Sequence, residues 1–70
     1  MHRTPVTSSN IQSIGYDALS AVLEVEFTSG DVYQYSNVPE HVYQQFMHAS
    51  SHGEFLADNI RYNYRYEKIK

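Results

Sequence analysis

The sequence has no cysteine, and this absence excludes disulfide bonds, thiolate zinc sites and cysteine nucleophiles. The chain also has no apolar run near the roughly 18 residues that a membrane-spanning helix needs. The opening segment, Met1–Pro5, lacks the apolar core of a signal peptide. We therefore expect a soluble, cytoplasmic protein that does not associate with membranes.

Basic residues are scarce along most of the chain. Residues 1–60 contain one Arg and seven acids, whereas residues 61–70 contain four Lys or Arg and one acid. The formal net charge of −3 therefore combines an acidic body at −6 with a basic terminal segment at +3. An acidic body repels phosphate, so the composition argues mildly against nucleic acid, and only the terminal segment could attract it.

The chain is short as well. Its 70 residues suffice for one domain, and a domain of this size buries only about 60% of the surface that its unfolded chain exposes. We expect a mobile N-terminal arm at residues 1–8 and a single domain at residues 9–70. Little volume remains for a buried ligand pocket of about 300 Å³ or more. Catalysis in an enclosed site is therefore not expected.

Three strands are predicted in the first half of the chain. Residues 11–17 have an extended pattern whose broken alternation indicates a bulge or bend. Residues 21–27 alternate apolar and polar side chains, which is typical of a strand with one buried face. Turn-forming residues at 28–31 then lead into a strand at residues 32–35. The last two strands should form a hairpin.

The loop of this hairpin decides where Tyr33 and Tyr35 lie, because a shift of one residue moves every side chain of a strand to the other face. A two-residue loop places both tyrosines on the exposed face. A three-residue loop with Gly30 in the left-handed conformation pairs Phe27 with Asp31 and places both tyrosines on the apolar face. We favour the second loop, because so small a domain needs apolar bulk.

Helices are predicted in the second half of the chain. Residues 36–40 are typical of a helix start, and the apolar stripe after them predicts a helix to about Ala49. Apolar spacing over residues 53–62 favours a second short helix capped by Ser50 or Ser51. The alternation from residue 60 onward is also typical of a strand. We expect an extended strand near residues 64–69. The predicted fold class is α+β: a three-stranded antiparallel meander with one or two helices packed on it and a short C-terminal strand.

Few residues are candidates for chemistry. Glu24 and Glu26 lie two apart on one strand, a spacing that an acid/base pair can use, but the solvated face of a strand explains them better. His48 and His52 have the spacing of metal ligands on a helix, yet the serines and glycine around them favour a helix break. No nucleophile motif surrounds any serine. We therefore predict that the protein is not an enzyme, and we assign no catalytic residue, metal site or cofactor.

Tyrosine is abundant, with seven Tyr against three Phe and no Trp, and three of the tyrosines alternate with cations in residues 61–70. Single-stranded nucleic acid is bound by this mixture of phosphate-binding cations and base-stacking aromatic rings. A simpler explanation is that the tyrosines pack this segment onto the core while the cations keep it soluble. The candidate RNA-binding residues are Arg61, Arg65, Lys68 and Lys70 for phosphates, and exposed members of Tyr33, Tyr35, Tyr64 and Tyr66 for bases.

An ordered set of short motifs in this sequence resembles the KTSC domain family over about residues 8–69. The set comprises Ser9-x-Ile11, Ile14-Gly15-Tyr16-Asp17, Leu23-x-Val25-x-Phe27, Gly30-x-x-Tyr33-x-Tyr35, Val38-Pro39, Val42-Tyr43, Ala49, Ser51-x-Gly53, Phe55, Ile60-Arg61 and Tyr64-x-Tyr66. Two departures stand out. Leu56-Ala57 occupies the place where members often have Phe-Asn, and Arg65 replaces a frequent proline.

The resemblance implies a function as well as a fold. The KTSC domain is named after its place at the C-terminus of some lysyl-tRNA synthetases, and it also occurs as a small stand-alone bacterial protein, which this chain resembles. RNA binding has been suggested for the family, so the resemblance implies a non-catalytic binding module whose partner is RNA, either tRNA or single-stranded RNA. The alternative is a protein-interaction module that uses the sheet face or an edge strand.

Overall fold

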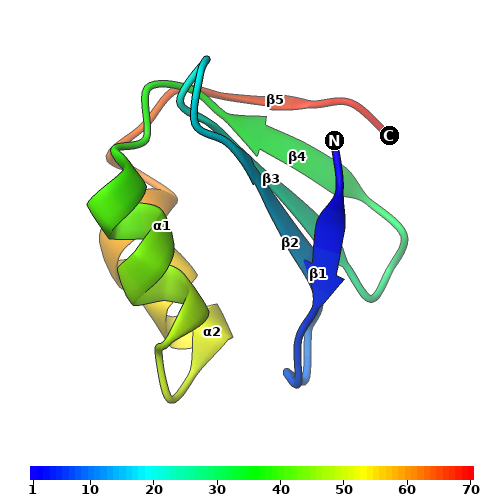
Figure 1. Ribbon diagram of the computed structural model, residues 1–70. Helices are drawn as coiled ribbons and strands as arrows, with labels where there is room; N and C mark the ends of the chain where they lie inside the picture. The colour runs from blue at the N-terminus through cyan, green and yellow to red at the C-terminus, as the bar shows by residue number, and fades with distance from the viewer.

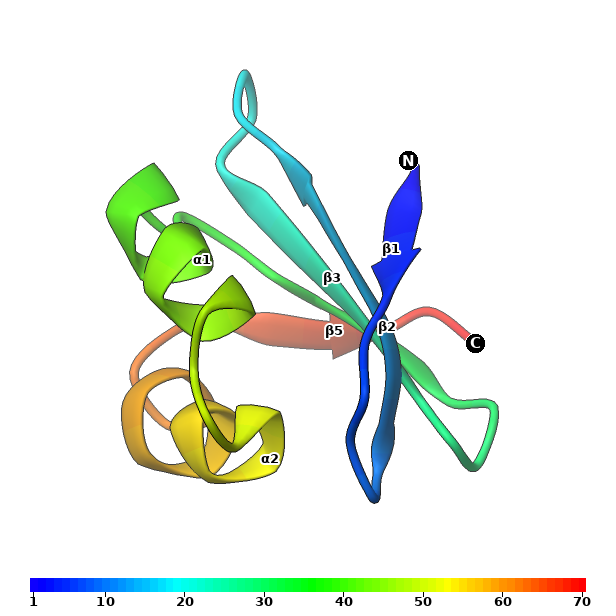
Figure 2. The same ribbon diagram turned by 60° about the horizontal axis from the view of Figure 1, so that its bottom comes forward.

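The computed structural model describes residues 1–70, which form one antiparallel sheet with helices on one side of it (Figures 1 and 2). The five strands follow one another across the sheet in chain order. They are β1 (Arg3–Pro5), β2 (Ile11–Asp17), β3 (Val22–Phe27), β4 (Val32–Tyr35) and β5 (Tyr66–Lys68). The predicted α+β class and the short closing strand are confirmed, and the predicted three-stranded meander is corrected to a sheet of five strands.

The additional strand is β1, which lies in the segment that we expected to be a mobile arm. Arg3–Pro5 pair with Ser13–Gly15 of β2, so part of residues 1–8 belongs to the sheet. Pro5 is tolerated here because β1 is an edge strand, where a missing N–H removes no ladder hydrogen bond. The predicted irregularity in the next strand is confirmed, because the register of β2 against β3 shifts between Ile11 and Ser13.

The hairpin between β3 and β4 has the three-residue loop that we favoured. The Phe27 N–H donates to the Asp31 carbonyl oxygen at 2.8 Å, and Gly30 has a φ of 96°. A residue with a Cβ is strained at that angle, so glycine allows the loop. Val25 is consequently opposite Tyr33, as the longer loop requires. Both tyrosines therefore lie on the apolar face.

The helices also follow the sequence pattern. They are α1 (Glu40–Met47), α2 (His52–Phe55) and a π-helical turn, η1 (Leu56–Ile60), which continues α2 directly. The Ser51 side chain accepts a hydrogen bond from the Glu54 N–H at 3.2 Å, so Ser51 caps the second helix as predicted. The chain breaks the helix between His48 and His52, which was also predicted.

The core lies between the helices and the sheet. Phe46 of α1 is completely buried and stacks on Phe55 of α2 with ring centroids 5.6 Å apart. The buried cluster draws on β2, β3, β4, the segment before α1, α1 itself and η1. It consists of Ile11, Ile14, Leu23, Val25, Tyr35, Val38, Phe46, Leu56 and Ile60. No helix has both the length and the hydropathy to cross a membrane.

Candidate functional site

A cleft of about 460 Å³, lined partly by apolar side chains, lies between the β3–β4 hairpin, β5 and the second helix. The sheet and its hairpin form one wall, and the second helix with the residue after it forms the other. The lining residues are Asn10, Phe27, Thr28, Ser29, Asp31, Tyr33, Tyr35, Gly53, Leu56, Ala57, Arg61 and Tyr66. Four of the eight candidate binding residues, Arg61, Tyr33, Tyr35 and Tyr66, therefore share this one cleft.

Aromatic rings form a continuous row on the sheet wall. The rings of Phe27 and Tyr33 meet edge to face with centroids 5.6 Å apart. The ring of Tyr66 lies 5.7 Å from that of Tyr33 and 5.9 Å from that of Tyr35. The row exists because β5 pairs with β4 in the register that sets Tyr66 opposite Tyr35. These distances are those of ordinary aromatic pairs, so the rings hold one another in place.

On the helical wall, the π-helical turn positions Arg61. The Arg61 N–H donates to the Leu56 carbonyl oxygen at 2.8 Å, five residues earlier in the chain. This wider turn brings Arg61 round to the side of Leu56 and Ala57, and all three line the cleft. The Arg61 guanidinium carbon also lies 5.4 Å from the centre of the Tyr62 ring, a cation–π contact on the solvent side. One cation therefore faces the aromatic wall across the cleft.

The two central tyrosines differ in what they offer to a ligand. Tyr35 is 3% exposed and belongs to the core, so its ring is not available for stacking on a base. Burial raises the pKa of the Tyr35 hydroxyl, and the positive charge of Arg61 opposes that shift without cancelling it. The hydroxyl is therefore neutral at physiological pH. Tyr33 is half-buried and Tyr66 is 56% exposed, so these two rings form the accessible part of the wall.

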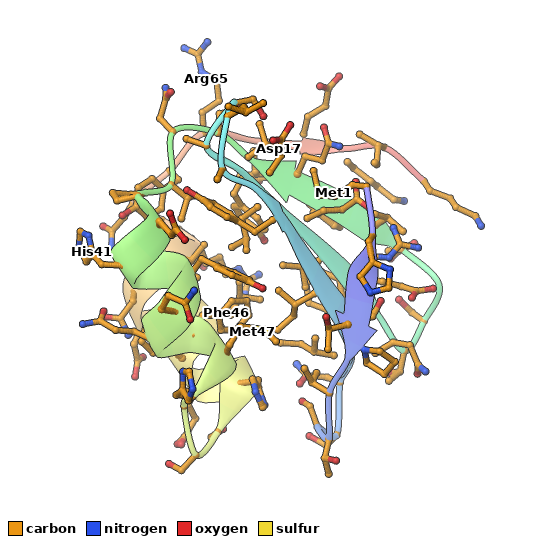
Figure 3. The ribbon with its side chains drawn as sticks, viewed as in Figure 1. Met1, Asp17, His41, Phe46, Met47 and Arg65 are labelled. Atoms are coloured by element: carbon orange, nitrogen blue, oxygen red, sulfur yellow. The ribbon has the colours of Figure 1, made fainter.

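The remaining candidate residues lie apart from one another. Lys68 is at the rim, since it pairs with Tyr33 across the ladder and its Nζ is 3.5 Å from Asp31 Oδ1. Arg65 lies before β5, and its side chain points away from the molecule (Figure 3). Tyr64 is half-buried against the core, and Lys70 lies beyond the end of β5. The cations of residues 61–70 therefore lie apart from one another and do not form one basic patch.

Sequence reasoning missed several residues that line the cleft. Phe27 and Asp31 flank the hairpin loop, and the three-residue loop places them on the same face as Tyr33. That register was the signal that could have found them. Asn10 reaches the cleft from the β1–β2 loop, and its Oδ1 lies 2.8 Å from the point where a Cβ on Gly53 would stand. Nothing in the local sequence indicates that contact.

Glu24 and Glu26 do not form the solvated face that we predicted for them. Arg3, Gly15, Glu24 and Gln34 stand in one row across the outer face of the sheet. Because Gly15 has no side chain, Arg3 passes over it and donates to Glu24 Oε2, while Gln34 donates to Glu24 Oε1 at 2.8 Å. The prediction of a solvated side chain is wrong for Glu24, which is only 5% exposed.

This row does not provide an acid/base pair. Burial raises the pKa of Glu24, but the hydrogen bonds from Gln34 and Arg3 and the charge of Arg3 outweigh that effect and lower it overall. The Glu26 carboxylate also has a partner, because the Ser13 hydroxyl donates to Glu26 Oε1 at 2.7 Å. A general acid needs a raised pKa and a free proton. The carboxylates therefore fasten β1 to the sheet.

The histidines do not gather into a metal site. No group of three or more His, Cys, Asp or Glu side chains lies close enough together to hold an ion. His48 Nδ1 lies 2.8 Å from the Gln44 carbonyl oxygen, within hydrogen-bond distance. The ring of His52 packs against Phe46 with centroids 6.1 Å apart. These two side chains take part in local packing around the helix break.

Comparisons with known proteins agree with this architecture. The sequence model of the KTSC domain matches residues 7–64. An uncharacterised protein of Stutzerimonas stutzeri is 40% identical over 70 residues, which is 99% of each chain. A lysine–tRNA ligase of Trichormus variabilis is 33% identical over 61 residues, which is 87% of this chain but only 11% of the ligase. The crystal structure of a KTSC domain protein from Yersinia pestis superimposes with a TM-score of 0.96 at 43% identity, covering 99% of this chain and 97% of that one. The chain belongs to the KTSC domain family.

Proposed function

We propose that this protein is a non-catalytic module that binds single-stranded RNA in the cleft between β4, β5 and the second helix. The observation that carries the proposal is the arrangement of Tyr33 and Tyr66 on one wall and Arg61 on the other. An unpaired base can stack on the tyrosine wall, and the adjoining phosphate can bind the guanidinium. Lys68 at the rim offers a second cation for the next phosphate.

A relative supports this function, and the charge distribution limits the length of RNA that could bind. The acidic body would repel an extended polyanion, so binding is confined to the few nucleotides that the cleft and its rim can reach. One relative that contains a similar region is a lysine–tRNA ligase. A module that reads a few unpaired nucleotides suits an enzyme that handles tRNA, because tRNA has single-stranded loops and a single-stranded end. We extend that association to this chain as part of the proposal.

The test is a comparison of two arginines in the same terminal segment. Arg61→Ala removes the cation in the cleft, whereas the matched control Arg65→Ala removes one that points away from it. The affinity for a fluorescein-labelled U-rich hexamer is measured by anisotropy between 50 and 200 mM salt, values chosen because phosphate contacts are strongly salt-dependent there. With two phosphates neutralised, log K should fall by about 1.4 per log unit of salt.

The two arginine variants should differ clearly in affinity and in salt dependence. Arg61→Ala should lower the affinity and reduce the salt slope by about 0.7, while Arg65→Ala leaves the slope unchanged. Tyr66→Leu, at an exposed position, should cost about 1–3 kcal/mol of binding free energy by removing one stacking partner. Equal effects of the two arginine variants would place the RNA elsewhere, and salt-independent binding would contradict phosphate contacts altogether.

A second candidate function is protein binding along the free edge of β5. This strand ends the sheet, and its outer backbone groups have no neighbouring strand. Tyr62 is 82% exposed and Ile69 is 47% exposed on either side of it, so apolar contacts flank the edge. An extended peptide could add a strand there. A protein partner captured in nuclease-treated extract, and lost when Lys68, whose N–H faces away from β4, is replaced by Pro, would favour this function over RNA binding.

A further inference from the structure

The cleft contains one feature that phosphate binding does not explain, which is the carboxylate of Asp31. Asp31 lines the cleft beside Phe27 and Tyr33, at the end of the hairpin loop. A carboxylate repels phosphate oxygens, so the part of a nucleotide that lies against Asp31 cannot be its phosphate. A carboxylate instead accepts hydrogen bonds from N–H donors. The N–H donors of a nucleotide are all on its base, and the remaining donor of an RNA nucleotide within a strand is its ribose 2′-hydroxyl.

The surroundings of Asp31 hold the carboxylate in position and leave it open to a ligand. Lys68 Nζ lies 3.5 Å from Asp31 Oδ1, and the two side chains are 46% and 55% exposed for Asp31 and Lys68 respectively. The main chain of Asp31 is fixed as well, because its carbonyl oxygen accepts from the Phe27 N–H at 2.8 Å. An ionised carboxylate has about four acceptor positions, so one loose ion pair leaves capacity for other donors.

The pattern of hydrogen-bond donors on the four RNA bases indicates which base would bind to the Asp31 carboxylate. Guanine alone among the four RNA bases presents two adjacent donors on its Watson–Crick edge, N1–H and the 2-amino group. Adenine presents one amino group next to an acceptor nitrogen. Cytosine likewise presents one amino group next to an acceptor nitrogen, and uracil presents one N–H between two carbonyl oxygens. A carboxylate is repelled by each of these neighbouring acceptors. Proteins read unpaired bases by this edge while the ring stacks on an aromatic side chain. The two oxygens of one carboxylate fit the guanine edge.

From this geometry we propose that the cleft selects guanine, with the carboxylate of Asp31 accepting hydrogen bonds from N1–H and the 2-amino group. The inference rests on the proposed RNA-binding function and specifies its ligand. The base stacks against Tyr33 and Tyr66, and the phosphate of the same nucleotide lies on the opposite side of the cleft at Arg61. The volume of about 460 Å³ lies within the range of ordinary small-ligand sites, which suits a single nucleotide.

The experiment measures the affinity of the protein for four labelled RNA pentamers that differ only at the middle position. Their sequences are UUGUU, UUIUU with inosine, UUAUU and UUUUU. The guanine pentamer should bind about fivefold or more tightly than the adenine pentamer, which is the lower end of discrimination by one bidentate contact. The inosine pentamer should fall between them, because inosine keeps N1–H and lacks the 2-amino group.

A matched pair of variants tests the role of the carboxylate. Asp31→Asn replaces the acceptor pair, and Glu67→Gln removes the same charge from the other face of the sheet, where Glu67 pairs with Gln34. Removing a negative charge should strengthen binding of all four pentamers in Glu67→Gln, whereas in Asp31→Asn it should strengthen binding of the adenine and uracil pentamers relative to the guanine pentamer, which loses its contact. Only Asp31→Asn should abolish the preference for guanine. The amide spectrum of each variant establishes that it is folded.

Each outcome tests either the guanine preference or the RNA-binding function on which that preference rests. Equal binding of all four pentamers by the native protein, with the salt slope intact, overturns the guanine preference and leaves RNA binding standing. Equal affinity for guanine and inosine overturns the contact with the 2-amino group, as does a guanine preference that survives Asp31→Asn. Failure to bind any pentamer, or tRNA, removes the proposed function together with the inference.

Discussion

Replacing Arg3 by Ala should detach β1 from the sheet, because Arg3 is the residue that joins this edge strand to Glu24. The Arg3 side chain is 30% exposed, whereas that of Glu24 is 7% exposed. After the substitution, Gln34 alone donates to the Glu24 carboxylate, which stays largely buried. The second ion pair, between Arg3 and Glu26 at 3.8 Å, is lost as well. The variant therefore leaves a buried charge with too few partners.

The cost of this loss follows from the exposure of the two side chains. A hydrogen bond to a charged group contributes about 1.5–3 kcal/mol, and the partial exposure of Arg3 reduces that figure to about 1–2 kcal/mol. A domain of this size has about 4–10 kcal/mol of stability in total. The loss should lower the melting temperature by about 5–15 °C. Arg65→Ala, at an exposed position without an ion pair, should change the stability by less than about 0.5 kcal/mol.

The assay is urea unfolding at pH 7, applied to a double-mutant cycle of Arg3→Ala and Glu24→Gln. The two side chains are in contact, so their effects should not add, and the coupling energy should be about 1 kcal/mol. Coupling below about 0.3 kcal/mol is within the scatter of independent sites. That result, or an Arg3→Ala variant as stable as the native protein, would refute the account of β1.

Two further predictions concern the same row of residues. The pKa of Glu24 is lowered from its ordinary value of 4.5, so its contribution to stability is present above that pH and is lost as the pH falls through the lowered value. Urea midpoints measured from pH 7 to pH 3 should therefore drop less in Glu24→Gln than in the native protein. Parallel curves for the two proteins would contradict this prediction. Gly15→Ala would set a Cβ 2.6 Å from the His2 carbonyl oxygen and 3.0 Å from Arg3 Cγ, so hydrogen exchange should show the amides of β1 losing protection while those of β3 keep theirs.

The sequence predicted the fold where local chemistry controls it. Gly30 is the decisive residue in the hairpin, because the three-residue loop needs a left-handed conformation and glycine is the residue that adopts it readily. From that loop follow the positions of Tyr33 and Tyr35. Ser51 likewise marked the start of the second helix through its side chain. Both predictions used the contacts of residues only a few positions apart.

The wrong predictions, for β1 and for Glu24, involve contacts between residues that are distant in sequence. Nothing around Arg3 indicates a strand, because its partner Glu24 lies 21 positions later and the contact depends on Gly15 lying between them in the sheet. Alternation correctly assigned Glu24 to the outer face, but it cannot show that another residue covers that face. The extra strand and the buried glutamate are consequently one error with one physical cause.

The candidate site could be predicted in part for the same reason. Alternation in residues 61–70 singled out Tyr66 and Arg61, and both line the cleft. It also grouped Arg65 with them, although Arg65 points away from the molecule (Figure 3), whereas Arg61 lines the cleft. Asp31 was not singled out, since its role depends on Lys68 and Tyr33 reaching the same rim through the pairing of β5 with β4.

The most direct test of the central claim is a map of amide chemical shifts on addition of the UUGUU pentamer and of tRNA at two salt concentrations. The account predicts shifts at Asp31, Tyr33, Arg61 and Tyr66 that weaken at the higher salt, with the amides of β1 unchanged. Shifts confined to β1 and the outer face of the sheet, or no shifts with either RNA, would contradict it.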